Sequence, residues 1–506
     1  MKIFGKIIFY FSMLGVLFFD GSCGDAFRLD LMPVSSLTDA SYWQTSEHWD
    51  SHMNGIHSRF RTHQMEFLRL GEFRSDIWGE QPFTGNTMLE LPVHTNTINE
   101  DNPGVTGFGG FYSNINQLNL IIDKTINTDI LSAENKQYIL GQAYGLRAYY
   151  YFHLLRSWGG TVIYDQPSYS FKIDELEKAA SSEAEVMAFI QTDLENSLTN
   201  FSGDYSFRTK VFWSKAATLM LKAEVYLWHA RRMGGGTEAA TTAKNALLDI
   251  QTNITSLALQ DNFRDIFSSD NKENDEIIFA IRHALDEYLF SWGSFVPRDI
   301  HFGDKHLDSL SGQPYTPETH NILTTGGGLF YAIKNEIYNG FHIDDSRRTA
   351  SLQAAYLYED GSYIQQTGVW QNKYQGSFSL GLRVWTDDYP IYRYADLLLM
   401  LAEAKGLLNE DPAPEINMIR ERAFGDKFSV ELHGYPNQPG DEDLDKALLN
   451  ERLFEFIAEG KRWYDLRRFG PEYVVEYTTA DQNRLLWPID LGALTDNRAL
   501  TQTPGY

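Results

Sequence analysis

Cysteine is nearly absent from this chain, and its scarcity excludes a disulfide framework. The 506 residues contain one cysteine, Cys23. A single thiol cannot form an intramolecular disulfide, and it cannot supply a Cys-x-x-Cys redox or zinc site. The folded chain must therefore be stabilised without disulfide bonds.

The N-terminal hydrophobic run is too short to be a comfortable transmembrane helix. Residues 7–19 (IIFYFSMLGVLFF) follow Lys2 and Lys6, whereas a spanning helix needs about 20 apolar residues. A positive region before a short apolar core is typical of a secretory signal. Small residues flank Cys23, as in lipoprotein signals cleaved before an acylated cysteine, although Asp20 stands where an apolar residue is expected. We therefore expect a lipoprotein signal over residues 1–22 and a lipid on Cys23; the alternative is a plain secretory signal.

Basic residues are scarce relative to acidic ones. The chain has 43 Lys and Arg against 68 Asp and Glu, a formal charge of −25, and loss of residues 1–22 would make it −26. Such a charge repels phosphate backbones, so nucleic acid is not an expected partner. It also disfavours binding to an anionic bilayer through a basic patch. Any membrane attachment should come from a lipid or a partner protein.

Apolar and aromatic residues are abundant. The composition is 43% hydrophobic, 14% aromatic and 22% charged, which is enough to bury a large core. The 11 Trp, 28 Tyr and 32 Phe residues exceed what a helical core usually requires. We expect some of these rings to contact a ligand.

Helical periodicity dominates the chain and predicts a mainly all-α fold. After the N-cap residue Ser132, apolar positions recur at helical spacing up to Trp158, and Ser182 with Glu185 forms a capping-box pattern. Small residues among large ones favour the close packing of tetratricopeptide-like helix pairs. We expect a single domain over residues 23–506, with an N-terminal part near 23–330 and a C-terminal part near 331–506. The expected helix pairs are near residues 111–158, 182–231, 392–424 and 444–469.

Long segments between the helix pairs are rich in Gly, Asn, Asp and aromatic residues. They cover residues 71–110, 286–330 and 360–390. Connections of this length are uncommon in compact domains unless they carry function. These segments are therefore the first place to look for a ligand site.

Six sequence blocks, in order and at matching spacing, resemble the SusD/RagB family. They are LDLMPVSSLTDASYW (29–43), GQAYGLRAYYYFHLLRSWGG (141–160), DEIIFAIR (275–282), YRYADLLLMLAEAKGLLN (392–409), INMIRERA (416–423) and LNERLFEFIAEGKRWYDLRRFG (449–470). The resemblance covers essentially the whole chain. It implies four tetratricopeptide-like helix pairs on one side of the protein and a loop-rich, more variable side with the ligand site.

The resemblance also implies a function and partners. Family members are outer-membrane lipoproteins of Bacteroidetes that face outward and bind glycans, or sometimes peptides. They form a lid on a SusC-like TonB-dependent transporter. For this chain the expectation is a non-catalytic glycan-binding lipoprotein that captures oligosaccharides for such a transporter. The alternatives are a binder of peptides or another nutrient, a degenerate glycoside hydrolase, and a purely structural lid.

The diagnostic blocks themselves have a structural interpretation. Alternating charges in 451–452, 459–462 and 465–468 could tie helix ends by ion pairs, and a solvated charged face fits at least as well. The aromatic run 149–152 is expected to pack in the core, as are Trp463, Tyr464 and Phe469. The ligand site is therefore expected in the loops.

Two loop segments combine an aromatic ring with polar side chains, the mixture that a sugar's apolar faces and hydroxyl edges require. The expected ligand-binding residues are Arg74, Asp76, Trp78 and Asn86 in segment 71–88, and Tyr288, Trp292 and Arg298 in segment 286–301. These segments occupy places that correspond to the binding loops of the family. Residues 326–331 (GGGLFY) are a third, weaker candidate.

Motifs for catalysis and for metals are missing. The chain has no GxSxG elbow, HExxH helix or phosphate-binding GxxxxGK[ST] loop. His48 and His52 lie one helical turn apart, but no acidic residue stands at diagnostic spacing. Asp441, Asp443 and Asp445 imitate the start of a calcium loop, but helix capping explains them. We expect no catalytic residue, no cofactor and no metal.

Overall fold

The structure is a computed structural model that describes residues 42–80, 83, 88–105, 108–169, 177–326 and 328–506. The chain divides into two compact units, Met1–His48 and Trp49–Tyr506. In the described part of the first unit, the rings of Tyr42 and Trp43 meet edge to face with centroids 4.9 Å apart. Cys23 and the predicted signal lie outside the described residues. The second unit holds the fold and the sites discussed below.

Helices account for most of the regular structure in the described residues. They are α3 (Ser46–Thr62), α4 (Gln64–Glu72), α5 (Leu91–His94), α6 (Gly110–Ile126), α7 (Ala133–Trp158), α9 (Glu183–Phe201), α10 (Lys215–Arg232), α11 (Gly236–Asn253), α12 (Asn335–Gly340), α13 (Ser346–Ser351), α14 (Tyr394–Leu407), α15 (Ala413–Phe424), α16 (Val430–His433), α17 (Leu444–Phe456), α18 (Arg462–Phe469), α19 (Pro471–Tyr477) and α20 (Leu491–Asp496). Strands are β1 (Ile277–Ile281), β2 (His306–Leu307), β3 (Leu352–Glu359), β4 (Ser362–Gln371), β5 (Ser377–Ser379), β6 (Leu382–Val384) and β7 (Tyr389–Arg393).

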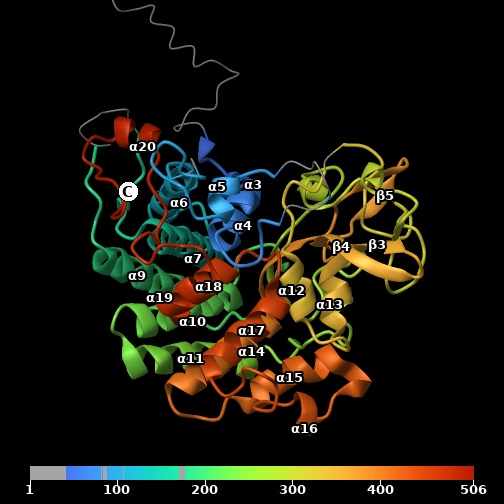
Figure 1. Cartoon of the computed structure of the whole chain (residues 1–506). Coiled ribbons are helices and arrows are strands. Elements are labelled where there is room, and N and C mark those ends of the chain that lie inside the picture. Colours follow the sequence, from blue (N-terminus) through green and yellow to red (C-terminus); the bar gives the residue numbers. More distant parts are fainter. Residues whose placement is uncertain (1–41, 81–82, 84–87, 106–107, 170–176, 327) are drawn as a thin grey trace, which may run out of the picture. The chain divides into compact units, whose positions relative to one another are not determined.

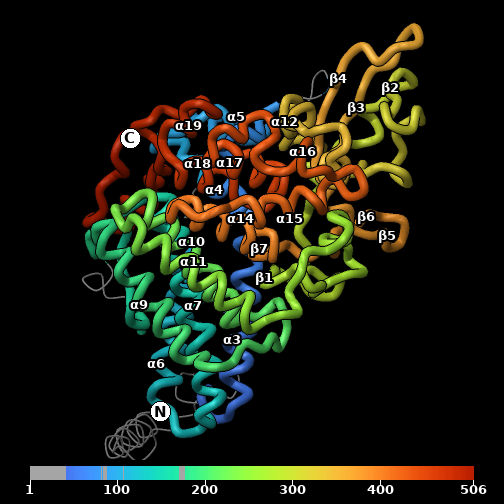
Figure 2. Tube along the Cα trace, turned by 90° about the horizontal axis from the view of Figure 1, so that it is seen from below, coloured from blue at the N-terminus to red at the C-terminus, as the bar shows by residue number. Residues whose placement is uncertain are grey.

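The prediction of a mainly α-helical, tetratricopeptide-like fold is confirmed. Helix α7 packs against α6 and α9, α10 against α11, and α14 against α11, α15 and α17. Helices occupy all four predicted pairs, and α11 is an additional helix that the sequence analysis did not predict. In Figures 1 and 2, α9, α10 and α11 lie side by side, away from β3, β4 and β5. The subdivision of the domain near residue 330 stays a prediction.

Capping and close packing at the predicted positions explain why these helices form. Ser182 and Glu185 make a complete capping box at the start of α9. Gly145 on α7 faces the indole of Trp213, and a Cβ there would lie 2.0 Å from Nε1, so no larger residue fits. The aromatic residues 149–152 are buried, as are Trp463, Tyr464 and Phe469, which confirms that they belong to the core.

Strands occupy part of the region that the sequence analysis treated as loop. Antiparallel β3 and β4 form a hairpin with β2 along its edge, and β5 pairs with β6 in a second hairpin. Both hairpins turn through two residues with positive φ, Asp360-Gly361 and Leu380-Gly381. An Asp-Gly pair between alternating runs is a strong hairpin signal, and the sequence analysis predicted no strand from it.

The strand pair β1 and β7 brings the most conspicuous charges of the fold together. The two strands run antiparallel with Ile277 opposite Arg393. Arg393 is wholly buried and donates hydrogen bonds to Glu276, Glu455 and Glu459 at 2.6 to 3.0 Å. One guanidinium cannot balance three carboxylates, and Arg422, Arg347 and Lys373 supply the further positive charges that pair with them.

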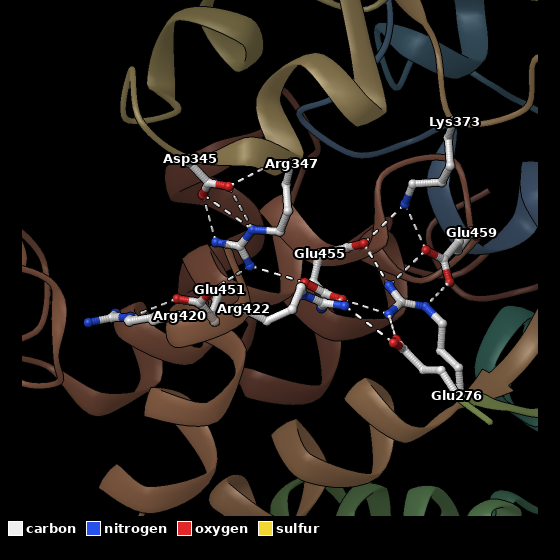
Figure 3. Close-up of polar contacts among 10 residues, drawn as sticks. Glu276, Asp345, Arg347, Lys373, Arg420, Arg422, Glu451, Glu455 and Glu459 are labelled. Atoms are coloured by element: carbon white, nitrogen blue, oxygen red, sulfur yellow. Dashed lines mark hydrogen bonds and ion pairs between the residues drawn. The ribbon is translucent and has the colours of Figure 1, made fainter. Parts of the chain in front are cut away.

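Arg393 belongs to a larger cluster, which we call the central ion-pair network (Figure 3). Its members are Glu276, Asp345, Arg347, Lys373, Arg393, Arg420, Arg422, Asp441, Glu451, Glu455 and Glu459, joined by ion pairs of at most 3.2 Å. The prediction left open whether charges such as Glu451 and Glu459 lie on a solvated face; the structure shows that they are buried. The network joins α13, α15, α17 and β7 to the segment after β4, and so fixes the base of the loop-rich side.

Candidate functional site

Trp78 and Trp292, the predicted sugar platforms, are both wholly buried. The Trp78 indole donates a hydrogen bond to Glu72, and the Trp292 ring stacks on Tyr374 with centroids 4.3 Å apart and an interplanar angle of 7°. Neither ring has a free face for a sugar. The prediction that these two residues are exposed platforms is wrong, because helices and strands distant in sequence cover both rings.

Arg74 and Asp76 are also inside the protein. Arg74 lies 4.4 Å above the Trp463 ring and donates to the carbonyl of Leu486, and burial lowers its pKa to about 10. Asp76 pairs with Arg462 at 2.8 Å. The two side chains attach the segment after α4 to residues 484–486 and to α18, so the structure contradicts their predicted contact with a ligand.

Two of the remaining predicted residues, Tyr288 and Arg298, lie nearer the surface. Tyr288 is half-buried beside His283, with ring centroids 5.7 Å apart. Arg298 is half-buried, and its backbone forms a bridge with Leu323. Asn86 lies outside the described residues. Ligand contact by these three residues stays a prediction.

The two predicted segments do meet, although through other residues. The Phe83 ring stacks on His301 with centroids 5.1 Å apart and an interplanar angle of 19°. Phe302 meets the Phe83 ring edge to face. All three rings are half-buried. The backbone N–H of Phe83 donates to the carbonyl of Thr367 on β4, which holds this point of the loop against the hairpin. The surface where the segments converge is therefore aromatic.

A pocket of about 230 Å³ opens on the same loop-rich side, and we call it the loop pocket. Leu323, which bridges Arg298, forms part of its wall. Thr324 and Thr325 are exposed in the lining, and the β5–β6 hairpin contributes the opposite wall. The third sequence candidate, segment 326–331, contributes Gly326.

The β5–β6 hairpin carries an exposed ring next to a positive charge in the loop pocket. Phe378 is 53% exposed, and the guanidinium of Arg383 lies 4.7 Å from the centre of its ring. Arg383 donates to the carbonyls of Pro317 and His320 at 2.9 and 3.1 Å, which fixes its position. Burial lowers the pKa of Arg383 from its ordinary 12.5.

Sequence reasoning missed Phe378 and Arg383, although a signal for them exists. The run SFSLGLRV, residues 377–384, has a short apolar alternation around a Gly-containing turn, which predicts a hairpin. Segment 360–390 was predicted to be a place for a ligand site, but no aromatic residue in it was predicted to contact the ligand. An exposed aromatic residue on a short hairpin was the feature to look for.

The described part of the chain contains neither a candidate membrane-spanning helix nor a candidate metal cluster. None of its helices combines the length and the apolar character that a membrane span requires. No group of His, Cys, Asp and Glu side chains in the described ranges is arranged to hold a metal ion.

Comparison with known proteins assigns the chain to a family. Residues 347–484 match the family model described as SusD family, and residues 29–227 match the model described as starch-binding associating with outer membrane. A solved SusD superfamily protein from Bacteroides vulgatus is 40% identical, with a TM-score of 0.85 over 92% of this chain and 100% of that one. The chain belongs to the SusD family.

Two further similar proteins extend this result. The chain is 43% identical to B. fragilis NanU, with a TM-score of 0.86 over 94% of this chain and 99% of that one. SusD-like protein P38 of Formosa agariphila is 28% identical over the full length of both chains. The family resemblance predicted from the six sequence blocks is therefore confirmed.

Proposed function

We propose that this SusD-family protein is a non-catalytic surface lipoprotein that captures oligosaccharides and delivers them to a SusC-like TonB-dependent transporter. The observation that carries the proposal is the exposed Phe378 ring beside Arg383 in the loop pocket, within a fold whose family model is described as starch-binding. An aromatic face suits the C–H face of a pyranose, and the guanidinium and threonine hydroxyls suit its hydroxyl groups.

The size of the loop pocket favours a single sugar ring. Pockets that enclose whole drug-sized ligands have volumes of about 300–1,000 Å³. At about 230 Å³ the loop pocket is smaller, so the rest of an oligosaccharide would lie across the surrounding surface. The half-buried rings of Phe83 and His301 on that side are available for further contacts.

The lining of the loop pocket supports binding rather than hydrolysis. Glycoside hydrolases use a pair of carboxyl groups on either side of the scissile bond. Among the described residues that line the pocket there is no Asp or Glu. Capture without cleavage is therefore the activity that this chemistry supports best.

Delivery rests on the N-terminal sequence and on the family. A lipid on Cys23 would hold the protein at the outer membrane, on the cell exterior, and the SusC-like transporter would receive the glycan when the lid moves. The description of the matching family model, which names association with the outer membrane, supports this placement.

A glycan array with the lipid-free mature chain, residues 23–506 carrying Cys23→Ala, tests the function. We expect binding to a limited set of oligosaccharides. Phe378→Ala should weaken that binding by about tenfold, the loss of roughly one aromatic contact, while the thermal midpoint stays the same.

The matched control is Tyr363→Ala, which removes a ring that is 40% exposed on β4 and does not line the loop pocket. Equal loss of binding in both variants would exclude the loop pocket as the site. Binding of peptides without any glycan would favour the alternative nutrient. Release of reducing sugar by the purified protein would overturn the non-catalytic assignment.

A further inference from the structure

A second and larger cavity lies away from the loop pocket. It has a volume of about 490 Å³ and is bounded by the start of α6, residues 162–169, and the end of the chain from α20 onward. In both Figure 1 and Figure 2, α6 lies far from β5, and the two cavities share no lining residue. We call it the tyrosine cavity, because Tyr112, Tyr164 and Tyr169 line it together with Phe108.

Two of these tyrosines form a rigid corner. The rings of Tyr112 and Tyr164 are perpendicular, with centroids 5.5 Å apart and an interplanar angle of 90°. The Tyr112 hydroxyl donates to the carbonyl of Val162 at 2.9 Å and lies 2.5 Å from the Thr161 hydroxyl. Because the phenol is anchored in the protein, the apolar part of the ring is left for the cavity.

The third tyrosine stands at the surface and is nevertheless held in place. Tyr169 is 61% exposed, and its hydroxyl donates to Asp123 at 2.8 Å. The ammonium of Lys124 lies 5.3 Å from the centre of the same ring. A large ring that is both exposed and fixed loses little entropy on binding, which is the property of a preorganised contact.

The polar groups that line the tyrosine cavity are mainly amides. Asn116 accepts a hydrogen bond from the backbone of Ser168, and Gln166 and Asn497 add two further amides. Asp496 is the one charged side chain among the described lining residues, while the ammonium groups of Lys124 and Lys178 lie 5.3 and 5.0 Å from the centres of the Tyr169 and Tyr164 rings. Amides can both donate to and accept from hydroxyl groups.

We propose that the tyrosine cavity is a second carbohydrate site. Perpendicular aromatic walls contact the C–H faces of a pyranose, and the amides bind its hydroxyls. The volume of about 490 Å³ falls within the range for small-molecule sites, which begins at about 300 Å³, and suits a disaccharide. The inference rests on the proposed glycan-binding function and extends it, because two separate sites on one chain let it hold one polymer at two points.

The experiment measures binding at the tyrosine cavity with the loop pocket weakened by Phe378→Ala. The lipid-free mature chain is titrated with maltose, lactose and chitobiose as neutral probes and digalacturonic acid as the acidic one, by saturation-transfer NMR. We expect Phe378→Ala to keep residual binding of at least one of these disaccharides. Adding Tyr169→Ala should weaken this residual binding by about tenfold, because one exposed ring contact is lost.

The control for Tyr169→Ala is Tyr226→Ala in the same background, which removes a half-buried tyrosine of α10 that lines neither cavity. The variant Tyr169→Phe keeps the ring and loses the bond to Asp123, so it should retain most of the binding. The circular dichroism melt of each variant confirms that the fold is intact.

The outcomes separate this inference from the proposed function. If Phe378→Ala abolishes all sugar binding, the loop pocket is the sole site and the second site is wrong, while the proposed function stands. If residual binding is insensitive to Tyr169→Ala, the inference fails in the same way. If the wild-type chain binds none of the probes and no array glycan, both fail.

Discussion

The indole Nε1 of Trp78 donates a 3.0 Å hydrogen bond to Oε1 of Glu72, and both side chains are wholly buried. The same carboxylate accepts the backbone N–H groups of Ala458 and Gly460, each at 2.8 Å. Gly71 allows this approach, since a Cβ there would lie 1.7 Å from the Gly460 oxygen. Trp78 is thus part of the junction between α4 and the turn that joins α17 to α18.

Replacement of Trp78 or Trp292 by alanine should destabilise the protein. Truncation of a buried aromatic side chain typically costs about 3–5 kcal/mol, since it removes apolar contacts and leaves a cavity. Urea denaturation of each variant measures the loss. Glycan binding per folded molecule should stay the same. Weakened binding with an unchanged urea midpoint would instead show that these rings contact the ligand.

The buried Glu72 should make stability depend on pH. Burial raises its pKa from 4.5 to about 7, and this effect exceeds the opposing effect of its hydrogen bonds. The folded state therefore binds the proton more tightly than the unfolded state, so the contribution is full below pH 4.5 and is lost as pH rises to 7. The order of magnitude of the loss is about 3 kcal/mol.

Glu72→Gln isolates this effect, because glutamine does not titrate. The free energy of unfolding of the wild type minus that of the variant, measured by urea denaturation at each pH, should fall between pH 4.5 and 7. Asp387, whose pKa is also raised to about 7 by burial, is present in both proteins and cancels. A difference that is flat across this range would contradict the assignment.

Removal of Arg393 should be among the most damaging single changes. Arg393→Met leaves Glu276, Glu455 and Glu459 without the cation that they share, and breaking a buried ion pair costs about 3–5 kcal/mol. Thermal and urea midpoints measure the effect. Lys305→Ala, which breaks the exposed pair with Glu359, is the control and should change stability by less than about 1 kcal/mol.

Cys23→Ala should release the protein from the cell surface without changing its binding in solution. The signal-like sequence before Cys23 is the basis for expecting a lipid on this residue as the attachment to the membrane. Fractionation of cells that lack the transporter tests this directly. A variant that stays in the membrane fraction of those cells would contradict the lipid anchor.

The helical side of the fold could be predicted because its signals are local. The capping box of Ser182 and Glu185 and the small residues of α7 act within a few turns of helix or on the neighbouring one. Helix α11 was missed because its alanines and threonines give a weak apolar stripe, and packing against α10 and α14 decides its formation. Local preference is a weak guide where tertiary contacts decide.

The ligand site was harder to predict because burial of a ring depends on distant segments. Glu72, the partner of Trp78, is bonded to Ala458, a residue 386 positions away in the sequence. Nothing in segment 71–88 reveals that contact, so a buried tryptophan and a sugar platform look the same there. The family resemblance related the two segments to the binding loops of the family, but it did not predict that Phe83 and His301 are the residues that meet.

The loop pocket separates the groups that hold its shape from those that face outward. Its frame depends on backbone hydrogen bonds, such as those between Leu323 and the 297–299 segment and between β5 and β6, which any side chain permits. Its rim consists of exposed residues such as Thr324, Thr325 and Phe378, where substitutions change stability by only about 0.5 kcal/mol. Rim residues can therefore be substituted one at a time while the protein stays folded, so the proposed ligand specificity can change in single steps during evolution.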